Sequence, residues 1–299
     1  MSIPSPKGRG NKASPVLMTN HSLEAIRYCI ELNTNHEIAT SRRALLPSES
    51  DHMQAGIKLI SEELRQRFCD AKNVLVLTGA GVSAESGVPT FRGGGGATGV
   101  WKGLPFDVIS SAGMLERDLP AVWEWFNYRR GLLEALKPNP AHEAIAGWQD
   151  RFGGLDLVTQ NIDGLHQAAG SREVIELHGS IWRARCVRCG QRQSIREIRV
   201  DDGEPVCLGC GGPMRPDVVL FGEMLPAGAF ERAAAKAASC ELCFVVGTSA
   251  VVYPAASIPE IARAAGAYVV EVNPERTLFS DFADEVLTGN AGEILPLLG

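Results

Sequence analysis

The 299-residue sequence contains no apolar run close to the roughly 18 residues that a membrane-spanning helix needs. It has no excess of positive charge, because 35 acidic residues outnumber 29 basic ones and leave a formal net charge of -6 at pH 7. These absences argue against a membrane protein and against a whole-protein field that attracts nucleic acid. What remains is a chain with 45% hydrophobic and 21% charged residues, typical of a globular protein with one large core or two smaller ones.

Residues 1–52 also lack something, namely hydrophobic periodicity, and they contain scattered proline, glycine, serine and asparagine. We expect a mostly disordered extension with one short helix between Leu23 and Leu32. No signal-peptide apolar segment is visible, and arginine is too sparse for a transit peptide. Met53 is an alternative start of the chain.

The eight cysteines do not suit a secreted disulfide scaffold, because the chain is too long and too rich in core residues to need one. Two Cys-x-x-Cys pairs instead predict a metal site, and 17 residues separate them: Cys186 and Cys189, Cys207 and Cys210. This spacing is typical of a four-thiolate zinc site. Because protein fills all four ligand positions, we expect a structural zinc. Metal-binding thiols also indicate a reducing compartment, and we expect the cytoplasm.

A third cysteine pair and a group of arginines are expected to be structural rather than functional. Cys240 and Cys243 repeat the pair, but Cys243 lies inside an apolar strand and no second pair with knuckle glycines accompanies it. The arginines around the zinc motif are expected to form a solvated face rather than a docking patch. These arginines are Arg183, Arg185, Arg188, Arg192, Arg196 and Arg199. We expect the negative charges of Glu197, Asp201 and Asp202 to balance their positive charges.

A short apolar strand that ends in a glycine-rich turn organises the chain. Val74 to Leu77 is an apolar run typical of a strand buried on both faces. Gly79, Gly81 and Ala84 follow and fit the looser form of the dinucleotide fingerprint. A strand that ends in Gly-x-Gly and opens a helix lets backbone N–H groups approach a pyrophosphate, with the helix dipole behind them.

The residues that follow differ from those of a dehydrogenase. That class has an acid about 20 residues further on, at the end of a second strand. Here no acidic residue lies between Glu85 and Asp107. Glycines 93–96 predict instead a flexible loop that closes over the ligand.

Further apolar runs predict strands that alternate with helical patterns: Leu155–Thr159, Val174–Leu177, Val218–Phe221, Leu242–Val246 and Tyr268–Val272. This alternation predicts an α/β fold with a doubly wound parallel, Rossmann-like sheet and a smaller inserted domain of helices and zinc ribbon. We expect 53–92, 149–180 and 218–299 in the sheet domain, and 93–148 and 181–217 in the small one. Ile57, Ile60, Leu64 and Phe68 recur at helical spacing, which predicts a helix that precedes the first strand.

Small or polar residues follow four of the predicted strands: Gly79 to Gly81, Gln160 to Asp163, Gly247 to Ser249, and Asn273. The carboxyl ends of parallel strands meet at one edge of a sheet, where open α/β sheets bind ligands. We therefore expect all four stretches to line one pocket long enough for a dinucleotide.

The run Gly79-Ala-Gly-Val-Ser-Ala-Glu-Ser-Gly-Val-Pro-Thr-Phe-Arg92 closely resembles the signature of the sirtuins, the NAD-consuming protein deacylases. Four shorter stretches resemble sirtuin motifs as well: Thr159-Gln-Asn-Ile-Asp163, Leu177-His-Gly179, Gly247-Thr-Ser249 and Val272-Asn-Pro274. With the zinc motif, the resemblance covers about residues 55–299. It is closest to the class that removes succinyl and malonyl groups, as Arg215-Pro-Asp-Val-Val-Leu-Phe-Gly-Glu223 and Cys240-Glu-Leu-Cys243-Phe-Val-Val-Gly-Thr-Ser249 indicate.

The resemblance implies a reaction and its residues. Sirtuins cleave the nicotinamide–ribose bond of NAD, and the acyl-lysine carbonyl oxygen attacks the ribose. His178 would be the general base, for which a near-neutral imidazole is suited, and Asn161 would assist. The resemblance also implies an NAD site formed by Gly79, Ala80, Gly81, Ala84, Glu85, Phe91, Arg92, Gln160, Asn161, Ile162, Asp163, Gly247, Thr248, Ser249, Asn273, Pro274, Glu275 and Ala291. Acylated lysine side chains of proteins would be the partners, bordered by Val219, Phe221 and Glu223 in an extended cleft.

The acyl group itself would be read from a helix predicted between Pro120 and Leu136. In the desuccinylase-type sirtuins a Tyr and an Arg three residues apart hold the acyl carboxylate. Arg129 matches the Arg, but Phe126 occupies the Tyr position, and Tyr128 should point to roughly the opposite face. We therefore expect mixed specificity, unless Arg129 merely belongs to a charged helix face with Arg130.

Two other functions remain open on these residues. ADP-ribosyl transfer or plain NAD hydrolysis would use the same fold and the same NAD site. A non-enzymatic zinc-ribbon interaction module would predict a basic stripe, which the acidic balance and the presence of His178 disfavour.

Overall fold

The computed structural model describes residues 60–89, 100–198 and 204–299. By its internal contacts the chain divides into residues 1–45 and 46–299, and all described residues lie in the second unit. None of the helices in these ranges is long and apolar enough to cross a lipid bilayer. Phe91, Arg92, the loop at 93–96, Asp201, Asp202 and the extension predicted for 1–52 lie outside the described residues.

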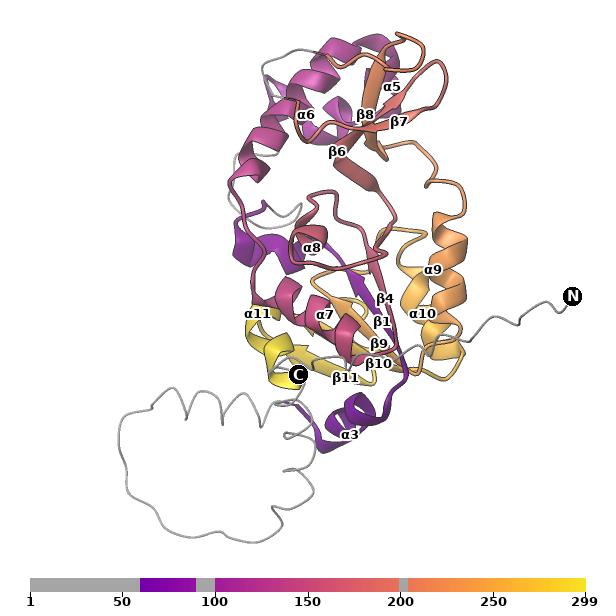
Figure 1. The fold of residues 1–299 in the computed structure, drawn as a ribbon. Coiled ribbons are helices and arrows are strands. Elements are labelled where there is room, and N and C mark those ends of the chain that lie inside the picture. The colour runs from indigo at the N-terminus through magenta and orange to yellow at the C-terminus, as the bar shows by residue number, and fades with distance from the viewer. Residues whose placement is uncertain (1–59, 90–99, 199–203) are drawn as a thin grey trace, which may run out of the picture. The chain divides into compact units, whose positions relative to one another are not determined.

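The centre of the fold is a six-stranded parallel sheet with the order β11-β10-β9-β1-β4-β5 (Figure 1). Its strands are β1 (Asn73–Thr78), β4 (Gly154–Thr159), β5 (Ile175–Glu176), β9 (Leu242–Val246), β10 (Tyr268–Asn273) and β11 (Glu285–Thr288). β1 lies between β4 and β9, so the strand order reverses beside it, which is where doubly wound sheets bind ligands. The predicted fold class is confirmed.

Helices cover both faces of the sheet. α7 (Pro140–Arg151) and α11 (Ala291–Ile294) lie on one face, and α9 (Ala229–Ala237) and α10 (Ser257–Ala264) lie on the other (Figure 1). The first face also receives α3 (Glu62–Asp70) and the short 3₁₀ helix η3 (Leu295–Leu298).

Alternate residues of each strand form the two cores, as expected for strands buried on both faces. Val74 and Val76 of β1 pack in the first core with Phe68 and Trp148, whose rings meet edge-on at 4.9 Å. Leu75 and Leu77 pack in the second. α7 contributes Ala141, Ile145 and Trp148 to the first core. This helix therefore packs on the sheet, although residues 140–148 of it were expected in the small domain.

The smaller part combines helices with an antiparallel sheet of order β7-β6-β8. Its elements are β2 (Val100–Trp101), β3 (Leu104–Pro105), α4 (Phe106–Ile109), α5 (Ala112–Arg117), α6 (Leu119–Glu134), β6 (Gly179–Cys186), β7 (Arg192–Ser194) and β8 (Met214–Val218). α6 begins after Asp118, whose carboxylate accepts a hydrogen bond from the Ala121 amide at 3.0 Å. Trp123 of α6 donates from its indole to the Met214 carbonyl at 2.8 Å, which fixes the helix to β8.

Two predicted elements differ from the observed ones, and one observed strand was not predicted. The strand predicted at 218–221 is β8, which ends at Val218 and pairs antiparallel with β6 rather than joining the parallel sheet. The helix predicted after Gly79 is the seven-residue 3₁₀ helix η1 (Ala80–Ser86), which ends at Gly87 with φ +90. β11 was not predicted, because its four residues contain only two apolar side chains.

Candidate active site

The register of the sheet brings the predicted strand ends together. Thr78 of β1 lies opposite Thr159 of β4 on one side and Val246 of β9 on the other, and Val246 lies opposite Val272 of β10. The next residue of each strand therefore reaches the same edge: Gly79, Gln160, Gly247 and Asn273. The convergence expected from the sequence is confirmed by this register.

The glycines at this edge serve a close approach between two loops. A Cβ on Gly81 would lie 2.7 Å from the Gly247 Cα, and one on Gly79 would lie 2.6 Å from the Thr248 Cβ. Their amides donate to the carbonyls of Gly247, at 2.7 Å, and Val246, at 3.0 Å. These two N–H groups are thus used within the protein, so the glycines shape the pocket rather than supply donors. Ala80 and the exposed Ala84 lie beside them on η1.

Gln160 and Asn161 are held at the start of the segment that follows β4. The Gln160 side-chain amide donates to Thr248 Oγ1 at 3.0 Å. The Asn161 amide donates to the Gly79 carbonyl at 3.0 Å and to Ser83 Oγ at 3.1 Å. Both side chains are half-buried and anchored through their nitrogens, which leaves their carbonyl oxygens as acceptors at this edge of the sheet.

Asp163 is buried beside them and its carboxylate is well supplied with donors. Its Oδ2 accepts from Ser83 Oγ at 2.8 Å and its Oδ1 from the Leu165 amide at 2.9 Å. Burial raises the pKa of Asp163, while these hydrogen bonds and the positive charge of Arg129 oppose the rise. Ile162, between Asn161 and Asp163, is half-buried and accepts the Ile181 amide on its carbonyl.

Two buried histidines contact hydroxyl groups of this hydrogen-bond network. The sequence did not predict this pair. His142 Nε2 lies 3.3 Å from Ser83 Oγ, and His166 Nε2 lies 2.9 Å from Thr78 Oγ1. Burial lowers the pKa of His142 to about 4 and that of His166 to about 3. Both rings are therefore neutral near pH 7. His142 also closes a capping box with Asn139, a sequence signal that could have located it.

His178 lies between β5 and β6, facing the end of β4. Its Nδ1 is 2.9 Å from the Gln160 carbonyl oxygen, which can only accept, so Nδ1 carries the proton. Nε2 is then left with the lone pair, as a general base requires. Burial lowers the pKa of His178, and the hydrogen bond to Gln160 opposes this. The His178 carbonyl accepts a hydrogen bond from the Val219 amide at 3.0 Å. This bond connects His178 to the segment that is predicted to border the substrate peptide.

The other end of the edge holds the residues predicted for adenosine. Asn273 is buried and donates its side-chain amide to the Thr248 carbonyl at 2.9 Å. Glu85 of η1 accepts the Gly292 amide at 2.7 Å, which joins η1 to the start of α11 beside Ala291. Ser249 is half-buried, whereas Pro274 and Glu275 are exposed.

The four cysteines of the zinc motif form one cluster. Their sulfur atoms all lie within 4.8 Å of one another, and the Cys186–Cys210, Cys189–Cys207 and Cys189–Cys210 separations are 3.5, 3.6 and 3.5 Å. A tetrahedral site with Zn–S bonds of about 2.3 Å has S···S edges of about 3.8 Å, so the donor set fits zinc. Amides of Arg188 and Cys189 point at Cys186 Sγ, at 3.3 and 3.4 Å, as in a zinc knuckle.

α6 packs against the part of the chain that carries the cysteine cluster. Its Trp123 packs in the hydrophobic core of the zinc ribbon with Cys186 and Cys207. Arg130, almost fully buried, donates to the carbonyls of Ile195 and Ile198, each at 2.6 Å. Arg130 therefore belongs to the ribbon rather than to a charged surface shared with Arg129.

Arg129 has different surroundings. It is half-buried, its guanidinium lies 5.6 Å from the centre of the Trp125 ring, and it interacts with Asp163 electrostatically. Burial lowers the pKa of Arg129 and the negative charge of Asp163 opposes this. Phe126, one turn before, is 3% exposed within the apolar core of the small part. Tyr128 is exposed and packs on Trp101 at 4.4 Å.

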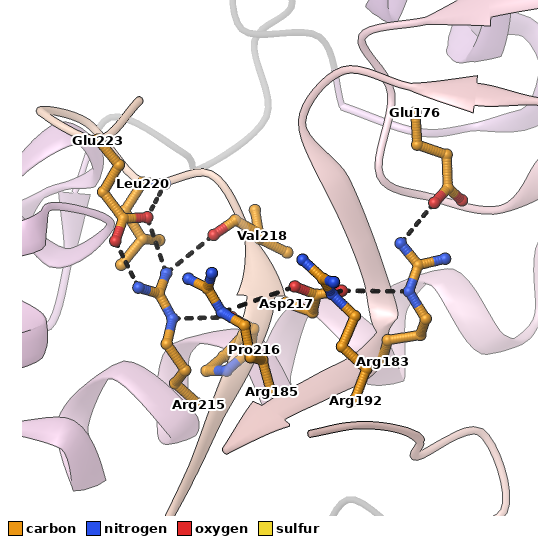
Figure 2. Close-up of polar contacts among 10 residues, drawn as sticks. All are labelled: Glu176, Arg183, Arg185, Arg192, Arg215, Pro216, Asp217, Val218, Leu220 and Glu223. Atoms are coloured by element: carbon orange, nitrogen blue, oxygen red, sulfur yellow. Dashed lines mark hydrogen bonds and ion pairs between the residues drawn. The ribbon is translucent and has the colours of Figure 1, made fainter. Parts of the chain in front are cut away.

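The segment predicted to border the peptide follows β8 and is held by an ion pair. Arg215 forms a two-pronged pair with Glu223 and donates to the Val218 carbonyl at 2.9 Å (Figure 2). Glu223 also accepts the Leu220 amide at 2.9 Å. Burial alone would raise the pKa of Glu223, but these hydrogen bonds lower it. Glu223 thus fixes the turn, while Phe221 is half exposed and Val219 half-buried.

A second cluster beside it contains three of the six arginines noted in the sequence. Asp217 accepts Arg183 at 3.3 Å and Arg192 at 3.0 Å, with Arg185 at 3.9 Å, and Arg183 also pairs with Glu176 at 2.5 Å (Figure 2). Asp217 and Glu176 thus balance these three arginines, whereas Asp201 and Asp202, which were expected to do so, lie outside the described residues. Asp217 directly precedes Val218, so this cluster also holds the start of the protein segment that is predicted to border the peptide.

Comparisons with known proteins agree with this geometry. The Sir2 family model matches residues 79–254. An "NAD-dependent protein deacylase 2" of Pyrobaculum aerophilum is 48% identical over 231 residues, covering 77% of this chain and 91% of the relative. A solved "Sir2 homolog–NAD complex" superposes with a TM-score of 0.73 at 40% identity, covering 80% of this chain and 93% of that one. A structure of "Sir2 bound to acetylated peptide" gives 0.68 at 30% identity, covering 79% and 95%. The chain belongs to the Sir2 family.

Proposed function

We propose that the protein is an NAD-dependent protein-lysine deacylase that transfers the acyl group to ADP-ribose and releases nicotinamide. The observation that carries this proposal is the position of His178. Its Nδ1 is fixed by the Gln160 carbonyl at 2.9 Å, so that Nε2 is the basic nitrogen at the edge where Gly79, Gly247 and Asn273 meet. The Sir2 homolog solved with NAD and the one solved with an acetylated peptide support both substrates.

His178 accepts a proton from a ribose hydroxyl in this proposal, which makes that hydroxyl a nucleophile toward the acyl carbon. Its lowered pKa keeps the imidazole unprotonated at neutral pH, ready to act. Asn161, anchored on Gly79 and Ser83, presents its amide oxygen to the same ribose. Asp163 and Gln160 hold the nicotinamide ribose and its amide, and Phe91 and Arg92 shield and position the ribose-phosphate.

Adenosine lies at the opposite end of the edge, against Ser249, Asn273 and Ala291. The contact of Glu85 with Gly292 closes this end, because it joins η1 to α11. The acylated peptide adds as an extended strand along Val219 and Phe221, with Glu223 holding their backbone through Arg215. One zinc, held by the four cysteines, supports the ribbon that carries this segment.

We further propose that Arg129 binds the carboxylate of an acidic acyl group. The protein would then remove succinyl and malonyl groups as well as acetyl groups. The electrostatic interaction of Arg129 with Asp163 supports this, because Asp163 is one of the residues that we propose for the NAD site. A planar guanidinium suits a carboxylate in two-pronged geometry. Phe126 offers no hydroxyl, so the carboxylate preference is partial. We place the protein in the cytoplasm, where reduced thiols hold zinc.

The test is a product assay with NAD and acetyl-, malonyl- and succinyl-lysine peptides, followed by mass spectrometry. O-acyl-ADP-ribose formed in equal amount with nicotinamide and free lysine is the expected result. Free ADP-ribose without deacylated peptide would favour NAD hydrolysis, and ADP-ribose attached to protein would favour ADP-ribosyl transfer. Either of those outcomes alone would overturn the proposal.

A further inference from the structure

The β10 strand carries a carboxylate, Glu271, that is completely buried in the sheet. No arginine, lysine or histidine among the described residues forms an ion pair with it. Instead three donors point at its oxygens: Thr277 Oγ1 at 2.5 Å, Asn273 Nδ2 at 3.0 Å, and Ser280 Oγ. A buried carboxylate is costly unless hydrogen bonds compensate, and these three donors supply them.

The hydrogen bonds of Asn273 fix which way its amide faces. Nδ2 donates to the Thr248 carbonyl at 2.9 Å and to Glu271 Oε1 at 3.0 Å, and both partners can only accept. Both amide hydrogens are therefore used. Within the part of the chain that the structure describes, no donor contacts Oδ1, so Asn273 presents a bare acceptor at the end of β10.

We propose that Glu271 is a positioning residue that locks Asn273 as an acceptor for an adenosine ribose hydroxyl and thereby selects NAD over its 2′-phosphorylated form. This rests on the proposed place of adenosine at Asn273. A ribose hydroxyl can donate to Oδ1, whereas a phosphate group has only acceptor oxygens at neutral pH. A phosphate oxygen there would face Oδ1 with no hydrogen between them to donate, and the two negatively polarised oxygens repel each other.

The basic residue nearest to Asn273 in the sequence already has a partner. Arg276 follows on the next loop, but it is exposed and pairs with Asp281 at 2.9 Å. Glu275, adjacent to it, is exposed and adds further negative charge. Sites that accept a 2′-phosphate typically place an arginine there, whereas sites for the unphosphorylated ribose present an acceptor.

The experiment measures binding of ADP-ribose and of 2′-phospho-ADP-ribose by calorimetry, with kcat and KM for NAD as a second readout. Glu271→Gln replaces one acceptor oxygen by a donor, so Asn273 loses its fixed orientation. We expect the Kd for ADP-ribose and the KM for NAD to rise on the order of 10-fold, with kcat changed less than about 2-fold. The ratio of the two Kd values should fall, because repulsion of the phosphate is reduced.

A double-mutant cycle separates the proposed route from a general loss of structure. Asn273→Ala should weaken ADP-ribose binding to a similar extent, and Glu271→Gln added to Asn273→Ala should weaken it no further. Thr277→Val is the matched control: it removes a second hydrogen bond from the same carboxylate without touching Asn273, so the Kd ratio should stay near wild type. Glu271→Asp serves as a second variant if Glu271→Gln does not fold.

The outcomes distinguish this inference from the proposed function. If Asn273→Ala leaves ADP-ribose binding unchanged, adenosine does not lie at Asn273 and both ideas fail at this position. If Asn273→Ala weakens binding but the Glu271 variants leave the affinity and the Kd ratio as in wild type, only the role of Glu271 is wrong. If Thr277→Val changes the ratio as much as Glu271→Gln, Glu271 merely holds the loop, and the inference is refuted.

Discussion

Arg129 offers the most informative perturbation of substrate choice. It is half-buried, with Asp163 as its charged neighbour and the Trp125 ring at 5.6 Å. Burial lowers the pKa of Arg129, and the negative charge of Asp163 opposes this. In the proposed contact the acyl carboxylate accepts hydrogen bonds from this guanidinium. A hydrogen bond to a charged group contributes about 1.5–3 kcal/mol, or about 10- to 150-fold. Arg129→Met should therefore lower kcat/KM for succinyl-lysine peptides by that factor.

Asp163 complicates the substitution, because Arg129→Met also removes a counter-charge from a buried carboxylate. Arg129→Lys is the matched control, since it retains the charge beside Asp163 but not the planar fork. We expect Arg129→Lys to lose part of the succinyl activity and almost none of the acetyl activity. Phe126→Tyr, which adds a hydroxyl one helical turn away, should raise succinyl kcat/KM by about 10-fold.

The assay is steady-state kinetics with acetyl- and succinyl-lysine peptides of one sequence at saturating NAD, and KM for NAD is measured for each variant. An unchanged KM for NAD separates loss of the acyl contact from loss of Asp163 function. Equal losses for both peptides in Arg129→Met and in Arg129→Lys would refute the reasoning, and the protein would then be a plain deacetylase.

Three further predictions concern the base and the metal. His178→Ala should fold and bind NAD but deacylate about 10²–10⁴-fold more slowly; near-normal turnover of the purified variant would exclude this base. Because burial lowers the pKa of His178 in the ligand-free protein, and the neutral ring is the active form, the acidic limb of the kcat/KM–pH profile should lie below pH 6.5. A limb above that value would contradict the assignment. Metal analysis should find one zinc per chain, and Cys186→Ala with Cys207→Ala should abolish it and lower soluble yield; retained zinc would exclude the site.

The features that sequence predicted best are those that depend on local pattern. β1 and β9 are continuous apolar runs because both of their faces are buried. That the residues after them meet at one edge followed from the geometry of parallel strands. The zinc cluster followed from spacing alone, because two knuckles place four thiolates together. These inferences needed no knowledge of distant contacts.

What sequence missed depends on partners far along the chain. His142 is 59 residues from Ser83, and only the fold brings them together. Glu271 was read as part of an apolar strand, although a lone acid among β-branched residues was a signal in itself. The glycine turn formed a 3₁₀ helix with its amides used internally, because Gly81 has to lie against Gly247. Periodicity cannot report such a contact.

The central claim is that this site couples NAD cleavage to acyl transfer from lysine, with His178 as the base. The most direct measurement is the stoichiometry of nicotinamide, deacylated peptide and O-acyl-ADP-ribose in a single reaction, with wild type and His178→Ala side by side. We predict a 1:1:1 ratio for wild type, since one NAD is used for each acyl group, and a rate at least about 10²-fold lower for the variant. Nicotinamide release without O-acyl-ADP-ribose, or an unchanged product yield in His178→Ala, would contradict the claim.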